Sequence, residues 1–328
     1  MRVAIVGAGI SGLAAARALV KGGHEVRVFE RAAGVGGRCS TRQLDGAIVD
    51  TGATSIAPRG RELEPMMLQE LNKDGLEPVA KPIYTHTGLR VSPGDTARST
   101  IIRYAYRQGN QRLPELLAEG LDICFESNIE AFAMRDDDFV VANDEFDALI
   151  LTQPAVEAHA MLTGLGINRP LGLCKFRPCL AVSLVYSATL DPQPYHALID
   201  PEQRHPLTWL SLESQKVPDR LAHEGTSMVA QLGPQFSADY FDSDEGGIIG
   251  ATVDYIEKLY GSAFGSPVAF DLMRWKYSQP ENVAMFDSVN RAGSNLIVAG
   301  DGLLWGRTED AHENGPKAPR RLMGTQRD

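Results

Sequence analysis

The sequence predicts an α/β protein with two domains, one built on a parallel sheet and the other mainly on an antiparallel sheet. Residues 2–30 carry the pattern of a strand, a glycine turn, a helix and a second strand. Short, continuously apolar runs recur at residues 148–151 and 296–299, which is typical of parallel strands buried on both faces. Longer strand-like runs between residues 172 and 275 indicate an antiparallel sheet. Together these patterns predict two sheets of different type.

The composition is that of a globular protein. The 328 residues are 43% hydrophobic and 23% charged, and this length allows one large domain or two intermediate ones. The formal net charge of -10 argues against a nucleic-acid or anionic-membrane partner, because both favour basic surfaces. The N-terminal apolar stretch lacks a cleavage site, and no run of about 18 apolar residues occurs elsewhere. We therefore expect a cytoplasmic monomer or dimer that does not bind membranes.

Cysteine and histidine spacing gives no sign of a disulfide framework or a metal site. Cys39, Cys124, Cys174 and Cys179 are scattered and form no CxxC pair, so we interpret them as reduced thiols. The 7 histidines contain no HExxH motif and no i, i+4 pair. We expect no protein-bound metal.

The first domain begins with a compact βαβ unit. Its strands are expected over residues 2–6 and 25–30. The helix between them is expected over residues 11–20, which are rich in alanine and leucine, and it should end at Gly22 and Gly23.

The middle of the chain alternates short strands with helices. A helix is expected over residues 62–72, because Leu63, Met67 and Leu71 fall on one face and Gly75 closes it. The acidic residues 136–138 predict a solvated hairpin turn. The other expected elements are strands at residues 47–50, 122–126, 129–134, 139–141 and 148–151 and helices at 113–119 and 154–162, the last opened by Pro154.

The second domain should contribute most of the antiparallel strands, and the chain then returns to the first. The last helix is expected from Glu309 to about Met323, with Pro316 in its first turn and Pro319 shortening or kinking it. The expected elements are strands at residues 176–186, 207–212, 228–232 and 296–299 and a helix at 242–260 with an acidic first turn, and the chain returns through 267–275. The predicted division is 1–80, 112–170 and 275–328 for the first domain, and 81–111 and 171–274 for the second.

A glycine motif follows the first strand directly, in the order Gly7-Ala8-Gly9-Ile10-Ser11-Gly12. A GxGxxG sequence between a strand and a helix is typical of a dinucleotide site. Gly7 makes the tight turn, Gly9 lets a pyrophosphate approach, and Gly12 permits close helix packing. Amide groups at the helix start would face the phosphates, and Glu30 at the end of the second strand can accept from ribose hydroxyls. A glycine turn without a ligand is the alternative.

A second glycine stretch, between Arg31 and Arg38, favours FAD over NAD. The backbone of Gly36 and Gly37 and the guanidinium of Arg38 can contact a pyrophosphate from its second side. These features together resemble the glutathione-reductase-like FAD proteins of the amine oxidase branch. The resemblance implies a Rossmann-like FAD-binding domain of the glutathione-reductase type and a substrate domain like those of p-hydroxybenzoate hydroxylase and the amine oxidases. No cysteine matches the family's attachment points, so the FAD would be non-covalent.

Later stretches match the same family. Residues 148–154 resemble its strand followed by T-x-P. Residues 298–301 resemble its C-terminal flavin element, in which Gly300 precedes an aspartate, here Asp301, that bonds a ribityl hydroxyl. Ile129 is similar to the position whose backbone meets adenine, and a core residue is the alternative.

The final helix start is also similar to that family. Glu309-Asp310-Ala311 resembles an E-G-A sequence at a helix start that points at the flavin pyrimidine, with Asp310 in place of the usual glycine. The positive end of such a helix stabilises the negative charge that develops there on reduction.

The segment Arg274-Trp275-Lys276-Tyr277-Ser278-Gln279 resembles the W-R-x-S-Q stretch of the renalase family. The resemblance covers nearly the whole chain and is strongest at residues 1–55 and 270–312. It implies an oxidase that takes hydride from 2- and 6-dihydro isomers of NAD(P)H onto flavin N5, and gives NAD(P)+ and, with O2 as acceptor, H2O2. Thr54 and Ser55 would stand near the flavin, where that family often has Gln-Tyr. Lys276, Tyr277 and Trp305 would lie near its reactive side, or else at a domain interface.

Other functions remain open. The chain can be an amine oxidase, another small-molecule flavin oxidase or desaturase, a non-catalytic flavin-binding redox module, or an NAD enzyme. In most of these functions the expected partner is a small-molecule substrate, either an amine or a dihydronicotinamide dinucleotide. Hydride transfer needs positioning and a dry pocket more than a general base, so the sequence assigns no catalytic side chain.

Overall fold

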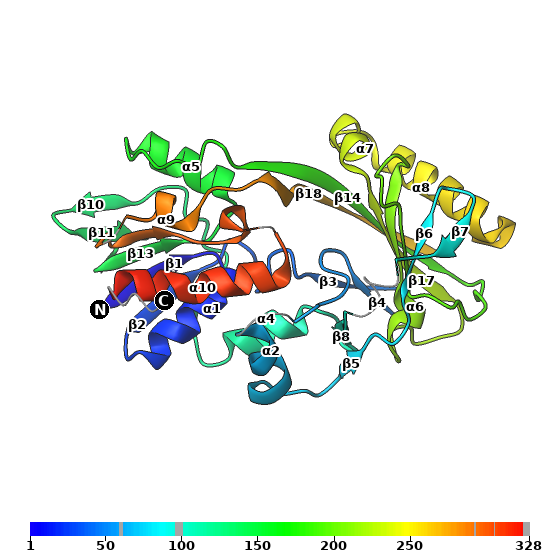
Figure 1. Ribbon diagram of the computed structural model, residues 1–328, viewed down its shortest axis with the longest axis horizontal. Helices are drawn as coiled ribbons and strands as arrows, with labels where there is room; N and C mark the ends of the chain where they lie inside the picture. Colours follow the sequence, from blue (N-terminus) through cyan, green and yellow to red (C-terminus); the bar gives the residue numbers. More distant parts are fainter. Residues whose placement is uncertain (59–61, 96–100, 292, 305, 324–328) are drawn as a thin grey trace.

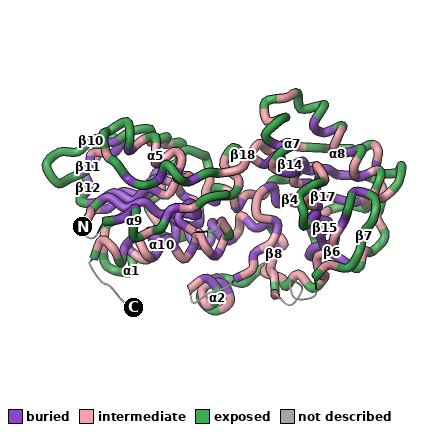
Figure 2. The backbone as a smooth tube through the Cα atoms, turned by 45° about the horizontal axis from the view of Figure 1, so that its top comes forward, coloured by how far each residue is buried: buried purple, intermediate pink, exposed green. Residues whose placement is uncertain are grey.

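The computed structural model describes residues 1–58, 62–95, 101–291, 293–304 and 306–323. Figure 1 shows two lobes, with the strands β14 (Lys175–Tyr186) and β18 (Ala269–Asn282) running from one lobe to the other. Figure 2 shows buried segments in the middle of each lobe and exposed segments around them.

A parallel sheet forms the core of the first lobe. Val3 and Ile5 of the central strand pack toward α1 (Ile10–Lys21). Ala4 and Val6 point to the opposite face and pack toward α5 (Ala155–Gly164). In spatial order the parallel strands are β19 (Leu296–Val298), β13 (Ala148–Leu151), β1 (Arg2–Val6), β2 (Glu25–Phe29) and β9 (Asp122–Cys124).

A mainly antiparallel sheet forms the second lobe. Helix α8 (Glu245–Tyr260) covers one face with Ile249, Val253 and Ile256, and Asp244 caps it by accepting from the Gly247 amide at 3.1 Å. In spatial order the strands are β18, β14, β17 (Thr226–Leu232), β16 (Leu207–Leu212), β15 (Ala197–Ile199), β6 (Ile83–His86) and β7 (Val91–Pro93). The predicted fold class, a parallel Rossmann-like sheet with a second antiparallel sheet, is confirmed.

Smaller elements connect and flank the two sheets. The short strands are β3 (Thr41–Leu44), β4 (Ala47–Asp50), β5 (Leu76–Pro78), β8 (Tyr104–Tyr106), β10 (Ala133–Arg135), β11 (Asp138–Val141) and β12 (Asp144–Phe146). The helical segments are α2 (Leu63–Pro65), η1 (Met66–Glu70), α4 (Arg112–Ala118), α6 (Glu213–Lys216), α7 (Pro234–Asp239), η2 (Ser262–Phe264), α9 (Phe286–Val289), η3 (Asp301–Leu303) and α10 (Thr308–Leu322). Strands β6 and β7 join the antiparallel sheet, and the exact division into two domains stays a prediction.

Two of the predicted elements differ from the structure. Instead of one helix over residues 62–72, the chain forms a short α-helix, α2, followed by a short π-helix, η1, which ends at Glu70. Gly75 lies in the turn before β5. The apolar positions of the helical segment are nevertheless buried, because the segment packs on the parallel-sheet core. The strand expected over residues 129–134 begins only at Ala133, because residues 127–131 form a loop that lines a cavity.

The prolines of the last helix also differ from expectation. Pro316 lies well beyond the first turn, and α10 continues through Pro319 to Leu322. A proline removes one helical hydrogen bond, but packing can offset that loss. Gly315 supplies the packing, because a Cβ there would stand 2.5 Å from the carbonyl oxygen of Ser11 in α1. Close contact between α1 and α10 therefore holds the helix together.

Among the residues that the structure describes, none of the helices combines the length and hydrophobicity needed to cross a bilayer.

Candidate functional site

A cavity of about 1080 Å³ opens at the carboxyl ends of the parallel strands. Its wall includes the ends of β1, β2 and β13, the start of α1, part of α5 and residues 273–279 of β18. Ligands of open α/β sheets bind at this edge, and a volume slightly above the usual range of about 300–1,000 Å³ suits a long ligand.

The first glycine loop forms one side of the cavity. Gly7 has φ +106°, and a Cβ there would stand 2.7 Å from Thr152 Oγ1. A Cβ on Gly12 would stand 1.9 Å from the Gly7 carbonyl oxygen, so this glycine is required by packing. By contrast, apart from Gly9 and its two chain neighbours, no described atom lies within 4 Å of the place that a Cβ on Gly9 would take. Gly9 therefore borders open space, where a ligand can approach the backbone.

The second glycine loop lies directly against the first. The Gly36 amide donates to the Ala8 carbonyl at 3.0 Å, and Gly9 and Gly36 form a parallel bridge. Gly36 and Gly37 have φ +124° and +55°, which explains why glycine stands at both positions. The amide groups of the first turn of α1 have no acceptor within the helix and face the same cavity.

Glu30 ties the end of β2 to the first glycine loop. Its Oε2 accepts from the Ala8 amide at 2.7 Å, and its Oε1 accepts from the Ala32 amide at 2.9 Å. An ionised carboxylate has about four acceptor positions, so two backbone donors leave room for ligand hydroxyls. Glu30 lines the cavity, and its contact with a ribose stays a prediction.

Arg38 and Asp301 pair with each other across the cavity wall. Arg38 Nη1 donates to Asp301 Oδ2 at 2.6 Å and Nη2 donates to Oδ1 at 2.7 Å. Nη1 also donates to the carbonyls of Tyr277 and Ser278, and the guanidinium lies 5.6 Å from the ring centroid of Phe176. The sequence assigned both charged groups to a ligand, and the structure brings them to the same point of the site.

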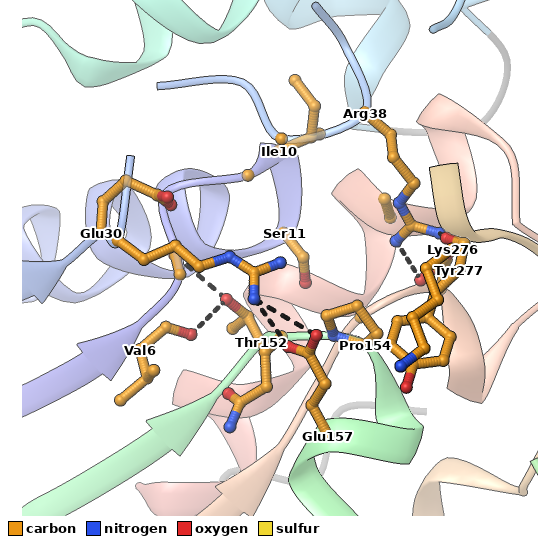
Figure 3. A pocket seen from close by; sticks show the side chains of 18 of the residues that line it. Val6, Ile10, Ser11, Glu30, Arg38, Thr152, Pro154, Glu157, Lys276 and Tyr277 are labelled. Atoms are coloured by element: carbon orange, nitrogen blue, oxygen red, sulfur yellow. Dashed lines mark hydrogen bonds and ion pairs between the residues drawn. The ribbon is translucent and has the colours of Figure 1, made fainter. Parts of the chain in front are cut away.

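Further charged side chains lie around the cavity, as Figure 3 shows for Glu157 and Lys276. Arg31 Nη1 donates to Glu157 Oε1 at 3.2 Å. Lys276 Nζ lies 5.4 Å from the ring centroid of Tyr277, beside Arg38 in the close-up. Trp305 lies outside the described residues.

Most of the other predicted site residues are found in the wall, but some lie behind it. Ile10, Ser11, Ile129, Gly300 and Ala311 line the cavity. The predicted residues that do not line it are Ala8, Gly12, Thr54, Ser55, Glu309 and Asp310.

Asp310 has a local task at the start of α10. Its Oδ2 accepts from the Arg307 amide at 3.1 Å, which caps the helix. The glycine usual in the resembled family would leave that amide without this acceptor.

Several lining residues were not predicted, among them Gln153, Met161, Gln231 and Met273. Gln231 lies on β17, and nothing in the neighbouring sequence indicates that its side chain faces the cavity. Gln153 is the middle residue of the T-x-P segment, which is a signal that points to it.

Unpaired buried polar atoms mark the cavity as a binding site. Ser11 Oγ and Gln153 Oε1 are buried, line the cavity and have no hydrogen-bond partner among the described residues. Buried polar atoms of this kind usually have a partner, which a bound ligand can supply. With the open space at Gly9, these residues fit a bound dinucleotide.

The cavity also contains a thiol, Cys39. Its Sγ donates to the Asn110 carbonyl at 3.1 Å. Burial, followed by the charge of Asp50, raises the pKa of the thiol far above its usual range. Cys39 therefore stays protonated and is a weak nucleophile.

The N-terminal part of the chain matches known protein sequences. A family model described as an NAD(P)-binding Rossmann-like domain matches residues 5–71. The zeta-carotene-forming phytoene desaturase of Myxococcus xanthus is 49% identical over 55 residues, which are 17% of this chain and 11% of the desaturase. The 4,4'-diapophytoene desaturase of Staphylococcus aureus (strain Newman) is 45% identical over 56 residues, again 11% of that protein. These matches concern the dinucleotide-binding segment.

Comparison with solved structures extends over the whole chain. A putative protoporphyrinogen oxidase from Exiguobacterium sp. 255-15 has a TM-score of 0.77 at 14% identity and covers 96% of this chain and 97% of its own. Cyclohexylamine oxidase from Brevibacterium oxydans IH-35A has a TM-score of 0.71 at 12% identity, with 98% of both chains covered. Putrescine oxidase has a TM-score of 0.72 at 14% identity and covers 99% of this chain and 100% of its own. At these identities the likeness establishes the fold.

Proposed function

We propose that this protein is an FAD-dependent oxidoreductase that binds its cofactor non-covalently in the cavity. The observation that carries the proposal is the meeting of two glycine loops and the Arg38–Asp301 pair in one cavity wall. The first loop and the start of α1 would hold one phosphate through backbone amides. Arg38 would contact the pyrophosphate from the other side, and Glu30 would accept from the ribose.

The bound FAD supplies a two-electron acceptor at its N5 atom. The chain's own task is to orient the hydride donor and to exclude water. Trp275 and Tyr277 of β18 give the cavity an apolar wall, and Arg38 donates to the Tyr277 carbonyl. In this proposal no side chain acts as a general base, and Ala311 at the start of α10 brings the positive helix end to the cavity.

The proposed substrates are misreduced nicotinamide dinucleotides, the 2- and 6-dihydro isomers of NAD(P)H, which become NAD(P)+ while O2 is reduced to H2O2. The charge of β18 supports this choice. Lys276 lines the cavity, and residues 273–279, all described, contain no carboxylate, while the guanidinium of Arg274 donates to the carbonyls of Phe241 and Ser243. A lysine on a strand segment without carboxylates favours a substrate that carries phosphates over a cationic amine.

A second candidate is oxidation of an amine. Cyclohexylamine oxidase and putrescine oxidase are among the proteins with the same fold over nearly all of the chain, which supports this alternative. Desaturation of a small molecule is a third candidate, supported by the desaturases that match the N-terminal segment. A binding module without turnover is the remaining one.

Rapid mixing under anaerobic conditions distinguishes these candidates. The purified protein should be yellow, and 6-dihydro-NAD should bleach its flavin absorption within seconds, whereas cyclohexylamine and putrescine should not. Readmitted O2 should restore the colour and release H2O2. Bleaching by an amine alone would favour the second candidate. A yellow protein that none of these compounds bleaches would favour the binding module, and a colourless protein that cannot take up FAD would refute the cofactor.

A further inference from the structure

Four consecutive backbone carbonyls at the edge of the cavity, two of them in its lining, each accept a hydrogen bond from a side chain of a different segment. The segment is residues 51–54, which follows β4 and forms no regular secondary structure. Gly52 and Ala53 line the cavity. Backbone groups of such a segment usually bond to water or to a neighbouring strand, so four side-chain donors in succession require an explanation.

The donors come from both lobes. Trp275 Nε1 donates to the Thr51 carbonyl at 2.9 Å, and Gln231 Nε2 donates to the Gly52 carbonyl at 2.7 Å. The next two carbonyls have buried donors. Asn110 Nδ2 donates to the Ala53 carbonyl at 2.8 Å, and Lys216 Nζ donates to the Thr54 carbonyl at 2.7 Å. Because every carbonyl of the segment has a fixed partner, the wall has little freedom to rotate its peptide groups.

Lys216 is the charged donor of this set, and it is fully buried. Its ammonium group also contacts Asp50 at 2.8 Å and Glu213 at 2.7 Å. Arg220 contacts the same two carboxylates at 2.9 and 3.1 Å, so two cations and two anions form a neutral buried cluster. Buried ion pairs contribute little to stability relative to apolar residues, and they are more readily explained by what they orient.

We propose that residues 51–54 are a preorganised wall segment, which faces the cavity with Gly52 and Ala53 and fixes the position of the reactants, and that Lys216 is a positioning residue that holds this segment through the Thr54 carbonyl. The inference rests on the proposed function. Lys216 is absent from the cavity lining, so it acts through the backbone and not on a ligand. Fixed backbone at a reaction site avoids reorganisation during the reaction.

A matched pair of charge-balanced variants tests this role. The double variant Lys216→Met/Glu213→Gln removes the donor to Thr54 and leaves Asp50 paired with Arg220. The double variant Arg220→Met/Glu213→Gln removes the same charges from the same cluster but leaves Lys216 on Asp50 and Thr54. Arg220 also donates to the Tyr106 carbonyl at 2.6 Å, so the second variant should lose at least as much stability as the first.

Amide hydrogen exchange of the 51–55 peptide is the first readout, because it needs no cofactor. We expect about tenfold faster exchange in the Lys216 variant, the effect of one lost charge-assisted hydrogen bond, and exchange close to wild type in the Arg220 variant. The second readout is FAD binding and its visible spectrum. The Lys216 variant should bind FAD about tenfold more weakly and shift the flavin absorption, and the Arg220 variant should do neither.

Equal changes in both variants, or no change in either, would overturn the proposal and leave the cluster a purely structural feature. If the Lys216 variant does not fold, Gln231→Met replaces it, since this neutral change removes the donor to Gly52 without stranding a charge. Unchanged exchange and FAD affinity in Gln231→Met would overturn the proposal as well. Failure of the wild-type protein to bind FAD would refute the proposed function, while the exchange measurement would still report on the wall.

Discussion

Arg38 and Asp301 form a bidentate ion pair, with Nη1–Oδ2 and Nη2–Oδ1 distances of 2.6 and 2.7 Å, although they are 263 positions apart in sequence. The Asp301 side chain is 6% exposed and that of Arg38 31%. The pair therefore joins the second glycine loop to the end of β19 inside the cavity wall.

Arg38→Lys should weaken FAD binding by roughly 10- to 100-fold, because lysine cannot make two parallel hydrogen bonds to Asp301 or a planar contact with a pyrophosphate. Fluorescence titration of the FAD-free protein measures this. Arg2→Lys is the control, since Arg2 pairs with Glu25 on the exposed surface. Equal affinity in both variants would contradict the role given to Arg38.

Two glycine substitutions in the same loop should have opposite effects. Gly9→Ala should leave the free energy of unfolding within about 0.5 kcal/mol of wild type, because its φ of -77° suits alanine and nothing described crowds the new methyl group. It should nevertheless abolish FAD binding, because the methyl group occupies the approach to the backbone.

Gly12→Ala should instead destabilise the fold by about 1–3 kcal/mol or more, because its methyl group overlaps the Gly7 carbonyl. Denaturant unfolding and FAD titration of both variants check this pair of predictions. A Gly9→Ala protein that still binds FAD tightly would place the phosphates elsewhere.

Arg220→Met alone should lower the free energy of unfolding by about 3–5 kcal/mol, because it leaves the buried carboxylates with one cation fewer. Burial raises the pKa of Asp50, but the charges of Lys216 and Arg220 outweigh that effect and hold the pKa at about 2. Arg107→Met is the matched control. Arg107 pairs with Glu77 and Asp219 on the exposed surface, so its loss should leave the free energy of unfolding in urea close to that of the wild type.

Stability should fall between pH 6.5 and 4 partly because of His312. Burial lowers the pKa of His312 to about 4, from an ordinary value of 6.5. In this window the unfolded chain takes up a proton at this residue and the folded chain does not, so the free energy of unfolding decreases as pH falls. The slope for one such histidine reaches about 1.4 kcal/mol per pH unit.

His312→Phe should reduce that slope, measured by urea unfolding at pH 6.5 and 5. His223→Gln is the control, because the pKa of His223 is shifted in the opposite direction. The carbonyls of Glu224 and Asp45 raise the pKa of His223, so its stabilising effect is gained as pH falls to 6.5 and is nearly constant below it, and its loss should leave the slope between pH 6.5 and 5 nearly unchanged. An unchanged slope in His312→Phe would show that its imidazole is not kept neutral by burial.

Lys276→Met should raise KM for 6-dihydro-NAD about five- to tenfold and leave kcat nearly unchanged, because a lost surface cation weakens binding of substrate and transition state alike. Steady-state peroxide release measures this. Lys258→Met is the control. Lys258 Nζ also lies over an aromatic ring, 5.7 Å from the centroid of Tyr255, but both residues belong to α8 and do not line the cavity. A fall in kcat with constant KM would contradict the role of Lys276 in substrate binding.

The parts that the sequence predicts well are those whose cause is local. The glycine motif specifies a strand, a tight turn and a helix start within a few residues, so Gly7, Gly9 and Gly12 could be assigned separate tasks. The second loop and Asp301 were assigned to one FAD because both stretches resemble the same family, and not because a local pattern places them together.

The parts that it does not predict depend on distant packing. Pro319 continues a helix because Gly315 lets α10 lie close to α1, and no local pattern contains that contact. The donors to residues 51–54 come from elements that only the folded chain brings together. Ile129 lies in a loop because its segment lines a cavity instead of pairing with a strand.

The position of β19 at the edge of the parallel sheet has a consequence for how the protein matures. The glycine loops are made within the first 38 residues, but the carboxylate that meets Arg38 belongs to residue 301. A growing chain on the ribosome can therefore complete its first βαβ unit early. At that stage it still lacks the Asp301 carboxylate that pairs with Arg38 in the proposed FAD site. Closing a segment of that length carries an entropic penalty, so FAD present during synthesis should speed the last folding step and leave the first one unchanged.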